Sequence, residues 1–238
     1  MTLIGMILLL LAALSIAAAG PAYRLGLLPL GDAFSMLRYG AFIGLAAAAI
    51  GLVAMIMAAI AGRLGRLLSS GLLVVASLVI VAVPWLQVQK AQGVPPIHDI
   101  TTDTRDPPAF QALVPAREAA PNAVDYPGEA TARQQEEAYP EIQPRLLDAP
   151  LERVREAAQA EILESGWELV AVTDTILEAT ATTLWFGFKD DVVVRLTDTQ
   201  EGVRVDMRSA SRLGTSDVGT NAARIQAYLA ALARRLEN

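Results

Sequence analysis

The sequence predicts two kinds of structure in one chain, namely three membrane-crossing helices followed by a soluble α+β domain. The 238 residues are 53% apolar and carry a formal net charge of −6. Residues 1–90 contain five basic side chains and one acidic one, whereas residues 91–238 contain 14 basic and 24 acidic ones. A cationic apolar part joined to an acidic part is typical of a membrane region that carries a soluble domain.

Three uncharged runs predict the membrane helices. They cover residues 2–23, 39–62 and 67–89, and each reaches the roughly 20 residues that cross a ~30 Å hydrocarbon core as a helix. Pro84 is expected to kink or end the third helix. The apolar link over residues 21–38 is expected to lie along the membrane interface.

The distribution of arginines between the runs predicts the orientation. Arg63 and Arg66 are crowded into a very short loop between the second and third runs, which favours that loop as cytoplasmic. The soluble domain then lies outside the cytoplasm. We therefore expect an integral protein of a bacterial inner membrane, with the lipid bilayer as a partner and the soluble domain in the periplasm.

Small residues in the second run predict close helix packing. Gly44 and Ala48, like Ala54 and Ala58, are four positions apart and so lie on one side of a helix. This surface fits packing against the first and third helices. A dimer or partner contact is the alternative.

A proline-rich stretch joins the two parts of the chain. Ten of the 13 prolines lie between Pro95 and Pro150, and each disfavours helix in the residue before it. The stretch also contains too many large apolar residues for a free linker. Residues 91–148 are therefore expected to wrap the soluble domain in extended form, with one short helix at Ala130–Ala138.

The compact domain is expected over residues 149–238, after the membrane region 1–90 and the wrap 91–148. A helix begins near Asp148 and ends at Gly166, and a last helix runs from about Ser216 to Leu236. Four strands joined by short turns are predicted between them, at Trp167–Asp174, Thr180–Phe188, Val192–Thr197 and Val203–Ser209. The order helix, four-strand antiparallel meander, helix predicts an α+β fold with both helices on one sheet face. The wrap would cover the other face.

The stretch Val203–Ile225 holds the densest set of functional groups. Arg208, Ser211 and Arg212 lie next to the expected start of the last helix, where free backbone N–H groups attract anions. This pattern predicts a site for a phosphate, a carboxylate or a lipid headgroup. The alternative is structural, with Asp217 occupying the helix N-terminus and Arg208 paired with a carboxylate such as Asp206 or Asp103.

A second polar stretch, residues 98–110, is expected to lie beside the first, because the domain is too small to keep them apart. Asp103 and Arg105 would then face Arg208 and Asp217 in one polar cluster. The candidate ligand-binding residues are Arg208, Ser209, Ser211, Arg212, Ser216, Asp217, Asp103 and Arg105.

Metal and cofactor sites are not indicated. The chain has no cysteine, and His98 is its single histidine, so a zinc site is not expected. Asp99, Asp103 and Asp106 lack the glycine turn and distal glutamate of a calcium loop, which favours capping and turn roles. We expect no metal, no cofactor and, without a basic stripe, no nucleic acid.

Several segments resemble a known family. They are HDITTDTRDPPAF (98–110), the pair Tyr139-Pro140, and VDMRSASRLGTSDVGTNAARI (205–225), which are similar to the hallmark segments of domain-of-unknown-function family 1499. The loop YRLGLLPLGDAF (23–34) is similar to a loop of longer members that carry N-terminal hydrophobic helices. The resemblance implies a membrane or envelope location and carries over no catalytic residue.

Two classes of function remain. In the first, the chain is a non-enzymatic, membrane-anchored envelope protein whose soluble domain binds a partner protein or a small anionic ligand. In the second, it is a membrane-bound hydrolase of an unrecognised type that uses Asp206, Ser209 or Asp217. A paired Arg–Asp network without a pocket would favour the first class, and a cleft with a carboxylate of raised pKa the second.

Overall fold

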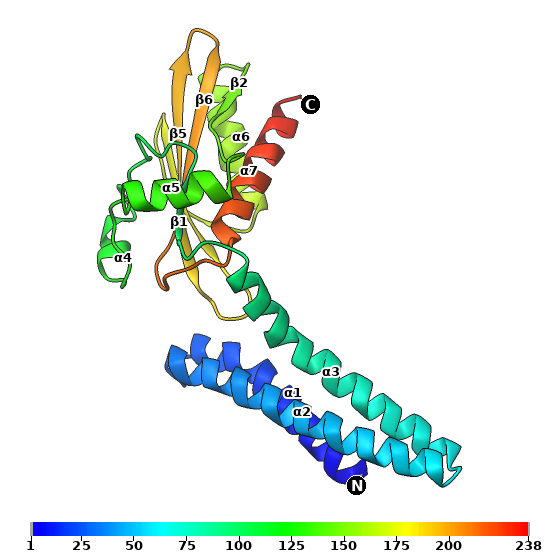
Figure 1. The fold of residues 1–238 in the computed structure, drawn as a ribbon. Helices are drawn as coiled ribbons and strands as arrows, with labels where there is room; N and C mark the ends of the chain where they lie inside the picture. The colour runs from blue at the N-terminus through cyan, green and yellow to red at the C-terminus, as the bar shows by residue number, and fades with distance from the viewer. Residues whose placement is uncertain (1, 238) are drawn as a thin grey trace. The chain divides into compact units, whose positions relative to one another are not determined.

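The chain consists of three long apolar helices followed by an antiparallel sheet with helices, as predicted (Figure 1). The computed structural model describes residues 2–237. It divides into two compact units. The first runs through Lys90 and also includes Leu184–Gly187, whereas the second holds Ala91–Thr183 and the chain from Phe188 onward.

The first unit contains the helices α1 (Thr2–Arg24), α2 (Leu30–Ile60) and α3 (Leu64–Gln92). By length and composition, all three can cross a membrane. One detail differs from prediction, because α2 begins at Leu30 and the link after α1 is therefore shorter than expected. Helix α3 continues past Pro84 to Gln92, so Pro84 does not end it. Membrane helices tolerate proline where neighbouring groups satisfy the freed carbonyl.

The small residues of α2 pack within the chain. A Cβ atom added at Gly44 would lie 2.7 Å from Val81 of α3, and one at Gly40 would lie 2.7 Å from Ile16 of α1. Such short distances to neighbouring side chains mean that a larger residue at either position would force those side chains to move. The packing expected for Gly44 is therefore observed. The dimer or partner contact stays a prediction.

The second unit is built around one sheet. Strands β3 to β6 form the predicted antiparallel meander, and the wrap adds two short strands that both pair with β6. The order is β1-β6-β5-β4-β3, with β2 also on β6. The strands are β1 (Asp99–Thr101), β2 (Arg145–Leu147), β3 (Glu168–Val172), β4 (Ile176–Thr182), β5 (Lys189–Thr199) and β6 (Gly202–Ser211).

The wrap completes the outer edge of β6. Strand β1 pairs with the end of β6 and β2 with its beginning. Between these two pairings, Thr102 bonds to β6. Its N–H donates to the Met207 carbonyl and its hydroxyl accepts from the Met207 N–H, both at 2.9 Å. The Gln135 amide accepts from the Thr101 N–H at 2.9 Å and donates to the Thr101 carbonyl at 2.6 Å. The wrap is thus part of the sheet as well as its cover.

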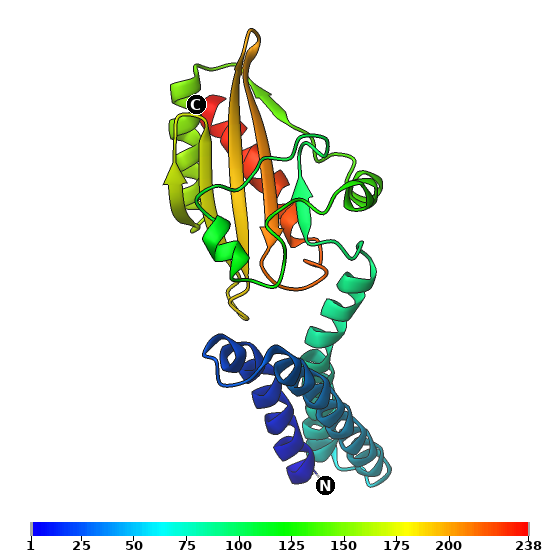
Figure 2. The same cartoon turned by 90° about the vertical axis from the view of Figure 1, so that its left-hand side faces the viewer.

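The two sheet faces have different covers. Helices α6 (Leu151–Glu164) and α7 (Thr220–Glu237) pack on one face, and Figure 2 shows α7 behind the strands with α4 (Val114–Glu118) in front. The helix-side core includes Leu177, Val192, Val194, Leu196, Val203, Val205, Met207, Ile225 and Leu232. On the other face, Phe110 and Leu113 of the wrap pack on Val193 and Ala210, as predicted. The expected short helix is α5 (Glu129–Ala138), whereas α4 was not predicted.

The second predicted strand was misplaced. Strand β4 ends at Thr182, and the following segment is a loop, closed by the Thr183 N–H donating to the Phe188 carbonyl at 2.9 Å. Gly187 has a φ of +70°, a left-handed conformation that breaks an extended run. The apolar and aromatic residues that suggested a strand here belong to the first compact unit instead.

Candidate functional site

Strand β6 sorts its side chains by face. Val203, Val205 and Met207 point into the helix-side core, so the alternate positions Arg204, Asp206, Arg208, Ala210 and Arg212 lie on the face that the wrap covers. Opposite charges from β4, β5 and the wrap meet them there. We call this set the charged layer; it comprises Asp99, Asp103, Asp106, Arg117, Glu178, Asp191, Arg195, Arg204, Asp206, Arg208 and Arg212.

Arg208 is held by a carboxylate of the wrap. Its Nε and one terminal nitrogen donate to the two oxygens of Asp99 at 2.9 and 2.8 Å, and both side chains are almost fully buried. The guanidinium also donates to the carbonyls of Pro108 and Val124. It lies 4.7 Å from the centre of the Phe110 ring. A bidentate pair of this kind fixes both partners in one geometry.

Asp191 of β5 is shared by two arginines. Arg117 of α4 donates to it at 3.2 Å, and Arg212 donates to both its oxygens at 2.7–3.1 Å. The side chains of Arg117 and Asp191 are completely buried. Burial lowers the pKa of Arg117, although Asp191 counteracts the shift. The hydrogen bond to Asp191 raises the pKa of Arg212.

Glu178 of β4 binds the wrap through its backbone. One carboxylate oxygen accepts from the N–H groups of Gln111 and Ala112 at 2.8 and 3.0 Å, and the other accepts from Leu113 at 2.9 Å. Three consecutive N–H groups form a concave donor site for an anion, and here the chain's own carboxylate fills it. Glu178 is 1% exposed, so this site is closed to solvent.

The outer part of the charged layer is more exposed. Arg204 bridges Asp103 at 2.6 Å and Asp206 at 3.0 Å, and Arg195 bridges Asp106 at 2.8 Å and Asp206 at 3.3 Å. Burial raises the pKa of Asp103, but hydrogen bonds from the Asp106 and Arg105 N–H groups and from Arg204 outweigh burial and lower it overall. Asp103 is therefore both a turn residue and an ion-pair partner.

The serines lie on the helix side of β6 and bond to α7. Ser209 donates to the Asn221 amide oxygen at 2.7 Å and accepts from Arg224 at 2.9 Å. Ser211 accepts from the Asn221 amide nitrogen at 3.1 Å. Arg224 also pairs with Asp190 at 2.7 Å. Both serines are buried and part of a structural network.

The N-terminus of α7 is occupied by the chain itself. Asp217 accepts from the N–H groups of Gly219 and Asn221 at 2.9 and 2.6 Å, as a capping residue does. Ser216 accepts from the Val218 N–H at 3.2 Å. Burial raises the pKa of Asp217, with a partial offset from its two N–H bonds.

The two polar stretches do meet, but with other partners than expected. Residues 99–101 pair with 208–210 in the sheet. Arg208 bonds to Asp99 rather than to Asp103, and Asp103 bonds to Arg204. The Arg105 side chain is exposed, and its backbone N–H donates to Asp103. Asp217 lies at the start of α7, on the helix side. The eight predicted residues thus fall into four places, since the exposed Arg105 belongs to none of the other three groups. Their role in ligand binding stays a prediction.

Sequence reasoning missed several of the residues that matter most here. Arg117 lies in a helix that was not predicted, and Asp191 was assigned to a turn. Glu178 precedes the predicted strand Thr180–Phe188, but the observed strand β4 contains it. The signal available was weak, since only Glu178 is a single charge within an apolar stretch, whereas Arg117 and Asp191 each stand next to another charged residue. His98 has a buried Nδ1 without a hydrogen-bond partner among residues 2–237.

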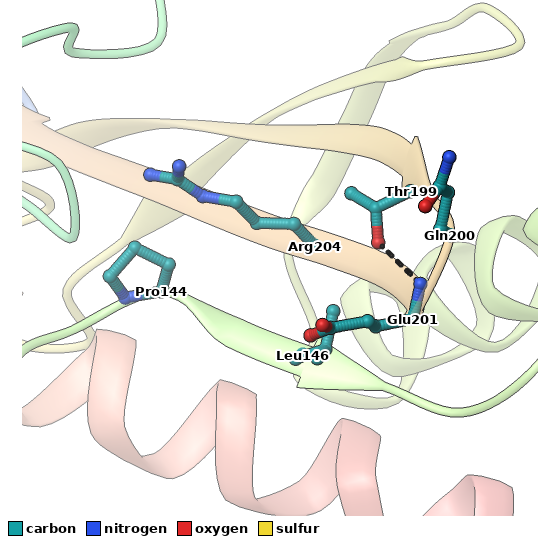
Figure 3. Close-up of a pocket in the computed structure, with 6 residues that line it drawn as sticks. All are labelled: Pro144, Leu146, Thr199, Gln200, Glu201 and Arg204. Carbon is teal, nitrogen blue, oxygen red and sulfur yellow. Dashed lines mark hydrogen bonds between the residues drawn. The ribbon is translucent and has the colours of Figure 1, made fainter.

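An open groove of about 620 Å³ lies beside the charged layer, at the turn between β5 and β6 (Figure 3). It is lined by Pro144, Leu146, Thr199, Gln200, Glu201 and Arg204. Arg204 is the member shared with the charged layer. No group of three or more side chains suited to metal binding occurs within the described part of the chain.

The family assignment follows from the segment that holds this layer. A family model described as protein of unknown function (DUF1499) matches residues 99–232, which is more than half of the chain. The chain belongs to the DUF1499 family. The match begins at the first residue of β1 and includes the whole charged layer. The family description gives no activity.

Other comparisons add little about this DUF1499 chain. No curated protein matches it. It is similar to the crystal structure of protein MLL2253 from Mesorhizobium loti, at 17% identity and a TM-score of 0.34 over 40% of this chain and 93% of that one. It is also similar to that of TTHA0849 from Thermus thermophilus, at 14% identity and a TM-score of 0.26 over 40% and 94%. At these scores neither structure bears on function.

Proposed function

We propose that this DUF1499 chain is a non-enzymatic protein of a bacterial inner membrane whose soluble domain faces the periplasm and binds a protein partner. Three apolar helices support the membrane location. The crowding of Arg63 and Arg66 between α2 and α3 supports the orientation. The observation that carries the non-enzymatic role is that the charged layer is bonded to itself.

The charge balance of this layer favours a protein partner over a small anion. It holds five arginines and five aspartates, together with Glu178, and its arginines pair with its own aspartates. An incoming phosphate would therefore meet no net positive charge. It would also have to displace carboxylates that already form short, charge-assisted bonds. Arg208 and Arg212 are structural on this account.

The groove beside Arg204 is the surface where a partner fits best. Its lining mixes apolar side chains with amide, hydroxyl and charged groups, as protein interfaces do. Leu146 is 49% exposed there, and it is one of few large apolar side chains that the second unit exposes. A partner that buries Leu146 against Pro144 and bonds to the polar rim would use all these features.

The hydrolase alternative depends on Asp217. Among the three residues considered for it, this carboxylate has a raised pKa. However, Asp217 already caps α7. Ser209 and Asp206 are buried, and both are bonded to other side chains. A reaction would require these bonds to open.

Crosslinking in intact cells tests the binding proposal. A photo-crosslinking amino acid replaces Gln200 in the groove or, as a matched exposed control, Arg133 on α5. We expect one discrete protein adduct from position 200, absent from position 133 and abolished by Leu146→Asp. Equal adduct patterns at both positions would refute a groove partner.

Assays on the full-length protein in detergent test the competing functions. Hydrolysis of p-nitrophenyl acetate or p-nitrophenyl phosphate that Asp217→Asn removes would replace the proposal with an enzyme. Saturable binding of inorganic phosphate, lost in Arg208→Gln, would replace it with an anion site. Fusions after Asn238 test the orientation, because alkaline phosphatase is active outside the cytoplasm and a cytoplasm-only fluorescent protein is not.

A further inference from the structure

The loop Leu184–Gly187 exposes a large apolar side chain, and the proposed function does not use it. It contains Leu, Trp, Phe and Gly in succession and carries no charge. Leu184 is 90% exposed, the highest value among the exposed large apolar side chains. These four residues belong to the same compact unit as the apolar helices.

Within that unit, helix α1 provides a seat for Trp185. Pro21 has no N–H, so it leaves the carbonyl four residues earlier, that of Ala17, without its helical hydrogen bond. The Trp185 indole Nε1–H donates to the Ala17 carbonyl at 3.2 Å. Gly20 makes room for the ring, because a Cβ atom there would lie 2.4 Å from Trp185 Cδ1. The Gly-Pro pair in α1 thus creates both the space and the free acceptor.

Aromatic and cationic groups fix the rest of the loop at the same end of α1. The Phe186 ring lies 6.1 Å from that of Tyr23 and 5.6 Å from that of Phe34, and Phe186 is 7% exposed. Arg24 donates to the Leu184 carbonyl at 2.9 Å. Tyrosine, tryptophan and arginine at the end of an apolar helix are the groups that lie at the lipid headgroup level.

We propose that Leu184–Gly187 is a second membrane contact, held by the Gly20–Pro21 seat, and that it places Leu184 in the bilayer interface. The occupant of the exposed leucine surface is lipid, because the loop is fixed where the uncharged run of α1 ends at Arg24. Transfer of an exposed leucine side chain from water to lipid lowers the free energy. The proposal depends on membrane insertion of α1 to α3, which the experiment checks separately.

Spin labelling of the full-length protein in phospholipid vesicles tests this contact. The chain has no cysteine, so Leu184→Cys takes a single nitroxide label without other changes. Collisions with oxygen report lipid, and collisions with a water-soluble nickel chelate report water. Leu72→Cys, 71% exposed on α3, is the lipid control, and Gln200→Cys in the exposed β5–β6 turn is the water control.

We expect the label at 184 to favour oxygen over nickel, as at 72 and unlike at 200. A nickel-accessible label at 184, with 72 in lipid, would overturn the loop contact while membrane insertion stands. A label shielded from both reagents would overturn it as well. Gly20→Ala should shift the label at 184 toward nickel, whereas Gly31→Ala, whose Cβ would meet no atom within 4 Å, should not. Equal behaviour of the two alanine variants would refute the seat.

Discussion

Strand β5 contributes to two buried surfaces of opposite chemistry. On one face, Val192, Val194 and Leu196 pack into the apolar core under α6 and α7. On the other face, Asp191 is completely buried among arginines, and Val193 lies beneath the wrap. The same strand therefore buries its residues by two different means. One is non-directional packing, and the other is a set of hydrogen-bonded charges.

The difference shows how an extended segment can be held in one position. The stabilisation from apolar packing depends on how much apolar surface is buried, so it tolerates small shifts of the packed segment. A buried ion pair penalises any shift, because an unpaired buried charge is costly. The wrap supplies Asp99 to the sheet and receives Glu178 and Asp191 from it, so its register on the sheet is fixed at several points.

The largest expected effects come from one substitution on each face of β5. Asp191→Ala should lower the free energy of unfolding by about 3–5 kcal/mol, because it leaves the buried guanidinium of Arg117 and the partly exposed one of Arg212 without a carboxylate partner. Leu196→Ala should cost about 2–5 kcal/mol through loss of apolar contact. The measurement is denaturant unfolding of the full-length protein in detergent, followed by fluorescence.

Asp198 is the matched control for this comparison, since it is an exposed aspartate on the same strand. Asp198→Ala should change the free energy of unfolding by less than about 0.5 kcal/mol. If Asp191→Ala behaved like this control, the charged layer would not hold the wrap. The two sheet faces would then differ in composition only.

A smaller effect is expected from the carboxylate that binds the wrap backbone. Glu178→Gln preserves the shape of the side chain but replaces one acceptor oxygen by an amide donor that faces N–H groups. The variant should lose about 1–3 kcal/mol in the same unfolding measurement. Glu118→Gln, on the exposed side of α4, should be neutral. Equal effects of the two variants would contradict a specific role for the Glu178 carboxylate.

The smallest effect is a dependence on pH from the exposed rim of the charged layer. The pKa of Asp103 is lower in the folded chain than its usual value of 3.8, so its ionised form favours folding. This contribution is present above the unfolded pKa and is lost as the pH falls toward the folded one. Between pH 5 and 3, roughly, Asp103→Asn should lose less stability than the native chain, as urea midpoints would show. In Asp198→Asn the urea midpoint should change with pH as it does in the native chain. The same native change in Asp103→Asn would refute the role given to Asp103.

Sequence patterns predicted the apolar half of this architecture better than the polar half. Val203, Val205 and Met207 alternate with charged residues in the sequence, and these three side chains do lie in the helix-side core. The charged layer depends on which wrap residue meets which strand residue, and no local period encodes that. Asp99 pairs with Arg208 because the register sets Asp99 opposite Ala210, two positions from Arg208 on the same face. Register of this kind emerges only from the assembled sheet.

The other edge of the sheet bears on how copies of this protein meet one another. The wrap fills the outer row of β6, whereas β3 pairs only with β4 among the described strands. An uncovered strand edge is a template on which copies of a protein can aggregate. Strand β3 is only five residues long, shifts register between Leu169 and Ala171, and exposes Glu168. These three features make edge-to-edge stacking between neighbouring copies unfavourable, even where membrane anchoring would raise their local concentration.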